Sequence, residues 1–354
     1  MGAPGTQRPG RDEVPRVLKR ILATAATVMA VAAAAVVASQ APAAPDEAAP
    51  VILREWPVPW EDTRPRDPDV APDGRVWFVG QRGDYLAWLD PESGEMERHD
   101  LPAGTGPHNL IVGGDGRVWY AGNRAAHIGW LAPGEERIET IAMPGDAARD
   151  PHTMVFGKDG VIWFTSQGGN SVGRLDIASG EVRLVEVPTP RARPYGIVVD
   201  GSGRPWLAEF GTNKLATIDP RTMTLEEVEL PRPEARPRRL AVTSDGAVWY
   251  VDYAAGFLGR YDPAAGSFEE WPVPGGGEAR PYGMASDDRG RLWLVETGSD
   301  PNRLVGFSPA DERFFSITAI PSGGGAVRHM VFHAPTRALW FGTDANTIGR
   351  AQVP

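Results

Sequence analysis

Short apolar runs separated by polar turns recur along most of the chain, from about residue 51 to the C-terminus. In each repeat one run carries a tryptophan and is bounded by turn residues, as expected for a strand. These tryptophans follow one another at intervals of 42 to 47 residues and are Trp77, Trp119, Trp163, Trp206, Trp249, Trp293 and Trp340. A fixed period of this length indicates propeller blades or solenoid coils.

Each repeat carries the signals of four strands. A turn such as Asp159-Gly160 or Asp245-Gly246 precedes the tryptophan strand, and a polar turn follows it. A third strand comes next, as in Phe257–Asp262, and then a fourth that ends in Pro, as in Glu269–Pro274. Four short strands in about 43 residues correspond to one propeller blade.

The two ends of the repeat array complement each other. The last repeat stops at Pro354 after its third strand, whereas Arg54–Pro59 closely matches the fourth strand Glu269–Pro274. We expect Arg54–Pro59 to complete the last blade, because its backbone groups can pair with the C-terminal strands and close the ring. The pattern predicts an all-β fold, a seven-bladed β-propeller with four-stranded blades over residues 51–354.

Residues before the repeats have a different composition. A polar segment with Arg16, Lys19 and Arg20 precedes an uncharged run over residues 21–39, followed by Ala41-Pro42-Ala43. This order is typical of an export signal over residues 1–43, with residues 44–50 as a flexible lead-in. The alternative is an uncleaved membrane anchor formed by residues 21–39. Either way we expect export, to the periplasm or the cell exterior.

The amino-acid composition argues against several folds and functions. Gly (42) and Pro (34) argue against helix bundles, and the formal net charge of −10 opposes nucleic-acid binding. The chain contains no Cys, so disulfides, thiolate metal sites and a Cys nucleophile are excluded. Because a closed propeller leaves no free sheet edge, we expect a monomer. We also expect no organic cofactor, and no membrane contact of the mature domain unless the N-terminal segment is retained.

Polar residues recur at one position of the repeat, eleven residues before each tryptophan. They are Arg66, His108, His152, Tyr195, Arg238, Tyr282 and His329. In a propeller the start of the innermost strand faces a central funnel, where function usually resides. The first six are candidate residues for binding a small or peptide-like ligand, and His329 is the candidate catalytic residue.

Three consecutive blades place a carboxylate three residues after the tryptophan, namely Glu209, Asp252 and Glu296. One interpretation makes an imidazole the general base and these carboxylates the ligands of a divalent cation such as Mg²⁺. The alternative is structural: the polar residues bond neighbouring blades, and Arg238 pairs with Glu209 or Asp252.

The repeat resembles that of the streptogramin B lyase (virginiamycin B lyase) family of seven-bladed propellers. The resemblance rests on segments such as Pro194–Ile197 with Trp206–Glu209, Pro281–Met284 with Trp293–Glu296, and Asn346–Arg350. It implies a carbon–oxygen lyase that opens a cyclic depsipeptide ester by elimination with Mg²⁺. The family's base, a His at the start of the last blade's inner strand, corresponds to His329.

This chain departs from the family pattern near that base. Val327 and Thr343 stand where the family has a pair of Glu, and Tyr282 stands where it has a His. From the resemblance as a whole, we expect a lyase-like protein that acts on an ester or lactone with His329 as base. The alternatives are a non-catalytic exported propeller that binds a small ligand, glycan or peptide in its funnel, and a gluconolactonase-like metal hydrolase.

Overall fold

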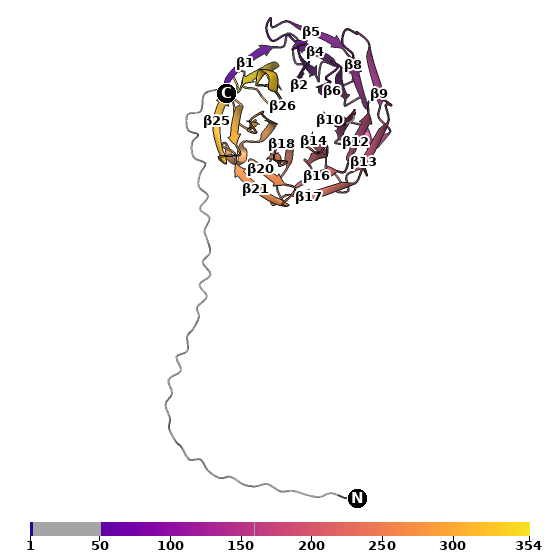
Figure 1. Ribbon diagram of the computed structural model, residues 1–354, viewed down its shortest axis with the longest axis vertical. Coiled ribbons are helices and arrows are strands. Elements are labelled where there is room, and N and C mark those ends of the chain that lie inside the picture. Colours follow the sequence, from indigo (N-terminus) through magenta and orange to yellow (C-terminus); the bar gives the residue numbers. More distant parts are fainter. Residues whose placement is uncertain (3–50, 159) are drawn as a thin grey trace, which may run out of the picture. The chain divides into compact units, whose positions relative to one another are not determined.

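The computed structural model describes residues 1–2, 51–158 and 160–354. Within these residues, seven four-stranded antiparallel sheets surround a common axis (Figure 1), which confirms the predicted seven-bladed β-propeller. We number the blades 1 to 7 in chain order, from the first complete sheet. The predicted export signal over 1–43, its alternative as an anchor over 21–39, and the lead-in over 44–50 lie outside the described residues, apart from residues 1–2.

In blades 1 to 6 the strands run outward from the axis in chain order, and in blade 7 the N-terminal strand is outermost. The inner strands are β2 (Pro65–Val70), β6 (Pro107–Val112), β10 (Pro151–Phe156), β14 (Pro194–Val199), β18 (Pro237–Val242), β22 (Pro281–Ser286) and β26 (Val327–His333). The second strands are β3 (Val76–Gly80), β7 (Val118–Gly122), β11 (Val161–Ser166), β15 (Pro205–Glu209), β19 (Val248–Asp252), β23 (Leu292–Glu296) and β27 (Ala338–Thr343).

The outer half of each blade is made in the same way. The third strands are β4 (Tyr85–Leu89), β8 (His127–Leu131), β12 (Ser171–Asp176), β16 (Lys214–Ile218), β20 (Phe257–Asp262), β24 (Arg303–Ser308) and β28 (Thr347–Gln352). The outer strands are β5 (Met96–Asp100), β9 (Ile138–Ala142), β13 (Val182–Glu186), β17 (Leu225–Glu229), β21 (Ser267–Pro272), β25 (Arg313–Ala319) and β1 (Ile52–Pro57). Three short 3₁₀ turns are described as well: η1 (Asp146–Ala148), η2 (Gly276–Glu278) and η3 (Ala334–Thr336).

Blade 7 is completed by the N-terminal strand, as the sequence predicts. Strand β1 pairs antiparallel with β28, so that Ile52 lies opposite Gln352 and Pro57 opposite Thr347. Figure 1 shows β1 beside the C-terminus. Trp56 stacks on Trp340 of β27 with 5.5 Å between ring centroids, which adds a side-chain contact to the backbone pairing.

The repeated tryptophans fill the space between neighbouring blades. Trp293, for example, is fully buried in a cluster with Leu304 of its own blade and Met330 and Phe341 of blade 7. Its indole N–H donates to Asp287 of the preceding turn at 2.9 Å, so the turn and the buried ring stabilise each other. Burial of one such side chain contributes roughly 4–6 kcal/mol of transfer free energy.

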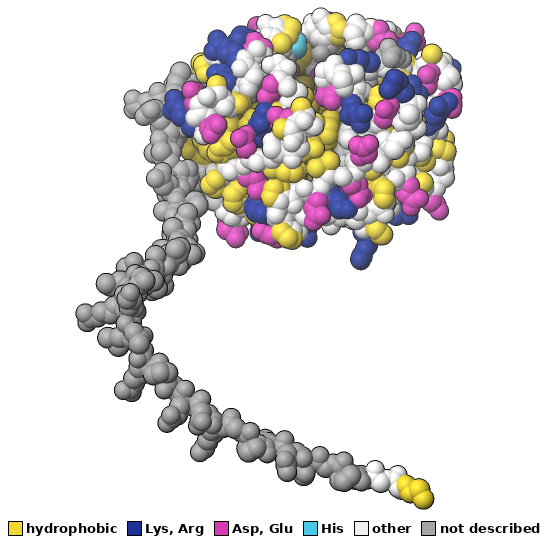
Figure 2. Space-filling view, turned by 60° about the horizontal axis from the view of Figure 1, so that its bottom comes forward, with side chains coloured by type: hydrophobic (Ala, Val, Ile, Leu, Met, Phe, Trp, Pro, Cys, Tyr) yellow, Lys and Arg dark blue, Asp and Glu magenta, His cyan; other side chains and the backbone are white. Residues whose placement is uncertain are grey.

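The outside of the propeller is highly charged. Figure 2 shows acidic and basic side chains interspersed over one view of it. Within the part of the chain that the structure describes, no helix has the length and apolar character needed to cross a membrane.

Candidate functional site

A β-bulge opens the inner strand of every described blade. In blade 2, Pro107 pairs with Gly122 and Leu110 with Tyr120, so that His108 and Asn109 together face the single residue Ala121. The register shifts at the same place in five of the other blades. In blade 1 Arg66 still pairs with Val79, and the shift falls between Arg66 and Asp69. Because a bulge releases residues from the regular ladder and re-aims their side chains, it presents two consecutive residues per blade at one end of the channel.

We call these two consecutive positions of the inner strands the first ring and the second ring, in chain order. The first ring consists of Arg66, His108, His152, Tyr195, Arg238, Tyr282 and Arg328. The second ring consists of Asp67, Asn109, Thr153, Gly196, Arg239, Gly283 and His329. Six of the seven residues predicted from the repeat therefore do lie together in the first ring.

His329 is the exception, and this corrects the prediction that places it with the other six. Val331 pairs with Trp340, nine positions on, whereas Ile111 pairs with Trp119, eight positions on. The additional residue lies in the hairpin that holds η3, so counting back from the tryptophan gives the wrong ring in blade 7. Arg328 takes the first-ring position, and His329 belongs to the second ring.

First-ring side chains pack on one another across the blades. The rings of His108 and His152 lie with their centroids 3.7 Å apart, and those of His152 and Tyr195 lie 4.3 Å apart. The Tyr195 and Tyr282 hydroxyls are hydrogen-bonded to each other. His108, His152, Tyr195 and Tyr282 are each at most 6% exposed, so these side chains close the channel at this end.

Arg238 of the first ring lies in a cage of aromatic rings. Its guanidinium carbon is 3.7 Å from the ring centroid of Tyr282, and it also lies over the rings of Tyr195, Phe210 and Tyr253. The predicted ion pair of Arg238 with Glu209 or Asp252 is not formed. Cation–π contact with several rings stabilises the guanidinium instead.

The carboxylate of Asp67 contacts residues of both rings. Its carboxylate accepts hydrogen bonds from Arg66 Nε at 3.1 Å and from Asn109 Nδ2 at 3.1 Å, and it lies 3.5 Å from Arg239 Nη2. Burial on its own would raise the pKa of Asp67, but the charges of Arg66 and Arg239 hold that pKa well below its usual value. Asp67 is therefore ionised at neutral pH.

His329 keeps a free imidazole nitrogen. Among the described residues its Nδ1 has no hydrogen-bond partner. Burial lowers the pKa of His329 to about 4; the carboxylate of Asp67 opposes this shift, and the charges of Arg239 and Arg66 add to it. The imidazole is neutral at pH 7 and can accept a proton.

The other two ring histidines are neutral for the same reason. Burial lowers the pKa of His108 well below its usual value, and Arg66 adds to the effect. Burial also lowers the pKa of His152, with Arg239 as the next cause. His108 Nδ1 lies 3.1 Å from the carbonyl oxygen of His152, so that the imidazole N–H on this nitrogen donates to it.

A cavity of about 370 Å³ lies in the channel beyond the second ring. Residues of all seven inner strands line it, and most are apolar, such as Leu110, Val198 and Met284. His329 and Asp69 are polar residues in this lining. Burial raises the pKa of Asp69 to about 6, although Val112 and Val70 donate backbone hydrogen bonds to it. His329 therefore borders this cavity.

The predicted metal ligands do not come together. Glu209 accepts a hydrogen bond from Thr212 Oγ1 at 3.0 Å, Asp252 pairs with Arg232 at 2.9 Å, and Glu296 bonds Arg303 and the Gly275 N–H. Among the described residues no group of three or more His, Asp or Glu is placed to hold a metal ion. The donor set present does not fit Mg²⁺.

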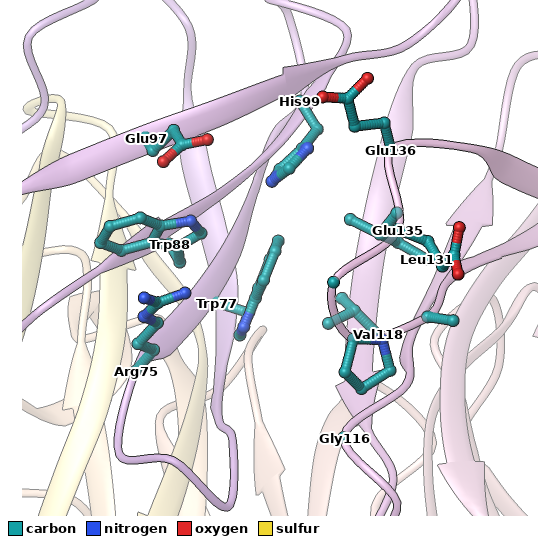
Figure 3. A pocket seen from close by; sticks show the side chains of 13 residues that line it. Arg75, Trp77, Trp88, Glu97, His99, Gly116, Val118, Leu131, Glu135 and Glu136 are labelled. Carbon is teal, nitrogen blue, oxygen red and sulfur yellow. The ribbon is translucent and has the colours of Figure 1, made fainter.

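A second hollow lies outside the channel, between blades 1 and 2 (Figure 3). It has a volume of about 230 Å³, and its lining includes Trp77, Trp88 and His99. The imidazole of His99 stacks on Trp77 with centroids 5.5 Å apart, and Arg75 lies over Trp88. A similar hollow between blades 3 and 4 is lined by Trp163, so such gaps belong to the packing of the blades.

Sequence reasoning missed the second ring except for His329. Asp67 and Arg239 immediately follow predicted residues, and each is a charged residue in the first half of an inner strand. A search for two polar positions per repeat, rather than one, would have found them. Their burial, at 1% and 3% exposed, required the structure.

Comparison with known proteins gives the family. The model of the virginiamycin B lyase family matches residues 51–251, more than half of the chain. The structure of virginiamycin B lyase from Staphylococcus aureus superimposes with a TM-score of 0.77 at 23% identity, covering 86% of this chain and 100% of that one.

A catalytically inactive variant of the Staphylococcus aureus enzyme, crystallised with quinupristin, gives a TM-score of 0.78 at 24% identity, with the same two shares of 86% and 100%. At these identities the likeness shows the fold alone. No curated protein matches the chain by sequence. The length of the family match, together with the seven blades, establishes that the chain belongs to the virginiamycin B lyase family.

Proposed function

We propose that the protein is a carbon–oxygen lyase that acts on an ester or lactone, such as a cyclic depsipeptide, by base-catalysed elimination. The observation that carries this proposal is the neutral imidazole of His329, which lines the channel cavity and has an unpartnered Nδ1 within the described residues. Family membership supports the reaction type. The proposal includes export to the periplasm or the cell exterior, on the basis of the signal pattern in residues 1–43.

His329 would remove a proton from the carbon next to a substrate carbonyl. The electron pair of that C–H bond becomes the new C=C bond, the C–O bond on the alcohol side of the ester breaks, and the ester oxygen leaves as part of a carboxylate. A positioned base of this kind contributes about 10²–10⁴-fold to the rate. The guanidinium groups of Arg66 and Arg239 lie near enough to lower the pKa of His329, so they also favour negative charge that develops beside it.

Incubation with a cyclic depsipeptide ester, followed by mass spectrometry, tests the proposal. Elimination opens the ring without changing the mass, whereas hydrolysis adds one water. We expect a ring-opened product of unchanged mass and its loss in His329→Ala. The matched control is His333→Ala on the same strand, because His333 lies near Thr336 in the hairpin with its Nδ1 2.8 Å from Oγ1. Binding of the depsipeptide without any product would favour the non-catalytic alternative.

A further inference from the structure

Positive charge exceeds negative charge where the two rings meet. Arg66, Arg238 and Arg239 bring guanidinium groups to this place, and Asp67 supplies a carboxylate that bonds Arg66 and lies 3.5 Å from Arg239. Arg328 of the first ring is neutralised elsewhere, by an ion pair with Asp344 at 2.7 Å. Among the described residues Arg238 has aromatic rings but no carboxylate as partner. Burying such charge without a counter-charge is costly.

Each of these arginines also has an unused hydrogen-bond donor. Within the described residues the buried atoms Arg66 Nη2, Arg238 Nε and Arg239 Nη2 have no hydrogen-bond partner. The remaining donors of Arg66 and Arg239 are directed by the protein: Arg66 Nη1 donates to Gln81, and Arg239 Nε and Nη1 donate to the Arg328 carbonyl and to Thr153. Each of the three guanidinium groups therefore keeps an N–H that can donate a hydrogen bond to an oxygen of a planar oxyanion.

The hydroxyl pair of Tyr195 and Tyr282 reports the same electrostatic field. Burial would raise the pKa of Tyr195, yet Arg238, Arg239 and Arg66 lower it to about 8. All three arginines therefore act on one spot, and they favour negative charge there. The neighbouring histidines contribute none of this charge because they are neutral.

We infer that this end of the channel is a binding site for a carboxylate, formed by Arg66, Arg238 and Arg239 around the hydroxyls of Tyr195 and Tyr282. Arg238 is half-buried, and its neighbours Phe210 and Tyr253 are half-buried too, so they form the accessible side of the site. A carboxylate on an aromatic or apolar body matches this side. The inference rests on the proposed function for one point: the elimination releases a carboxylate, and this site would hold it as it leaves.

Thermal unfolding with benzoate as probe tests the inference without any turnover. At constant ionic strength we expect benzoate to raise the melting temperature of the wild-type protein, because a ligand that binds the folded state stabilises it, with a saturable shift of at least about 2 °C. Benzamide, which has the same shape and no charge, should give no shift. Inorganic phosphate serves as a second oxyanion and should compete with benzoate.

Single substitutions test whether benzoate binds at the proposed residues. Arg238→Gln should lose the benzoate shift, whereas Arg193→Gln should keep it, because Arg193 lies over the same Phe210 ring but is exposed to solvent. Equal shifts from benzoate and benzamide, or no shift from benzoate in the wild type, would overturn the inference even if Arg238→Gln fails to fold. Benzoate binding without depsipeptide turnover would leave this site standing and remove the proposed reaction, and turnover without benzoate binding would do the reverse.

Discussion

The hydroxyl of Tyr195 in blade 4 is hydrogen-bonded to the hydroxyl of Tyr282 in blade 6, although 87 residues separate the two in the chain. The contact skips blade 5, whose first-ring residue Arg238 lies against both tyrosine rings. The arginines around this pair lower the pKa of Tyr195, while burial and the nearby Tyr195 raise the pKa of Tyr282. Tyr195 is therefore the member that ionises first.

Tyr195 gives a prediction on alkaline pH. Its pKa is about 8 in the folded protein and 10.0 for an unperturbed tyrosine, so the folded state releases this proton earlier than the unfolded state. The contribution of Tyr195 to stability should therefore grow as the pH rises from about 8 to 10. Denaturant unfolding of wild type and Tyr195→Phe at several pH values measures it. Parallel pH profiles of the two proteins would contradict the assignment.

Asp67→Asn should destabilise the protein strongly. The substitution leaves Arg66 and Arg239 buried without their carboxylate, and loss of one member of a buried charged network costs about 3–5 kcal/mol. Since the pKa of Asp67 is lowered in the folded state, its contribution is present above the ordinary carboxyl pKa of 3.8 and disappears as the pH falls below it. Urea unfolding measures the loss, and Asp73→Asn, at an exposed turn, is the control.

The lowered pKa of His329 predicts that the protein loses stability in acid. The pKa of His329 is about 4 in the folded protein and 6.5 unperturbed, so the unfolded state binds this proton first. Stability should therefore fall as the pH decreases from 6.5 towards 4. His329→Gln should flatten this part of the stability profile, measured by urea unfolding. A profile that stays as steep as that of the wild type would show that the pKa of His329 is not lowered in the folded protein.

Magnesium should leave the melting temperature unchanged. Asp252 and Glu296 already pair with Arg232 and Arg303, so a cation would have to displace these arginines. Among the described residues Glu209 joins no group of three acidic or His residues able to hold a metal. Thermal unfolding in EDTA and then in millimolar Mg²⁺ checks this. A rise in melting temperature that disappears in Glu209→Gln with Glu296→Gln would restore the metal interpretation.

Closure of blade 7 should be visible in stability. Trp56→Ala removes a buried ring that stacks on Trp340, and such truncations in a core cost about 3–5 kcal/mol. Ile52→Ala on the same strand is the control, because Ile52 is 70% exposed. Chemical denaturation of both variants gives the comparison. Similar midpoints for the two would mean that β1 contributes little to closing the ring.

The repeat pattern was sufficient for the fold and for part of the site. The tryptophan period and the match of Arg54–Pro59 to an outer strand predicted the blades and their closure, because each depends on local sequence. The same period placed Tyr195 and Tyr282 at one end of the channel. It could not show that their hydroxyls meet, since that depends on how blades 4, 5 and 6 pack.

Two features escaped the sequence for physical reasons. One residue added to the hairpin of blade 7 shifts His329 by one position along its strand, and a period counted from the tryptophan does not detect it. The carboxylate partners were also hidden, because Arg232 and Arg303 lie outside the repeat positions that were compared. The repeat pattern also does not show which charges of the two rings pair with each other, because that depends on side-chain contacts between blades.

The bulges described for the inner strands separate scaffold from chemistry. Except for Arg66, which pairs with Val79, the residues of the two rings have no ladder partner, so an exchange of their side chains leaves the sheet's regular backbone pairing in place. Two ring residues nevertheless belong to the frame: Asp67 holds the charges of Arg66 and Arg239, and a side chain at Gly196 would meet the backbone oxygen of Arg238 at 2.7 Å. For protein engineering, the ring positions other than these two can be randomised to sample new ligands, while the tryptophans between the blades keep the propeller folded.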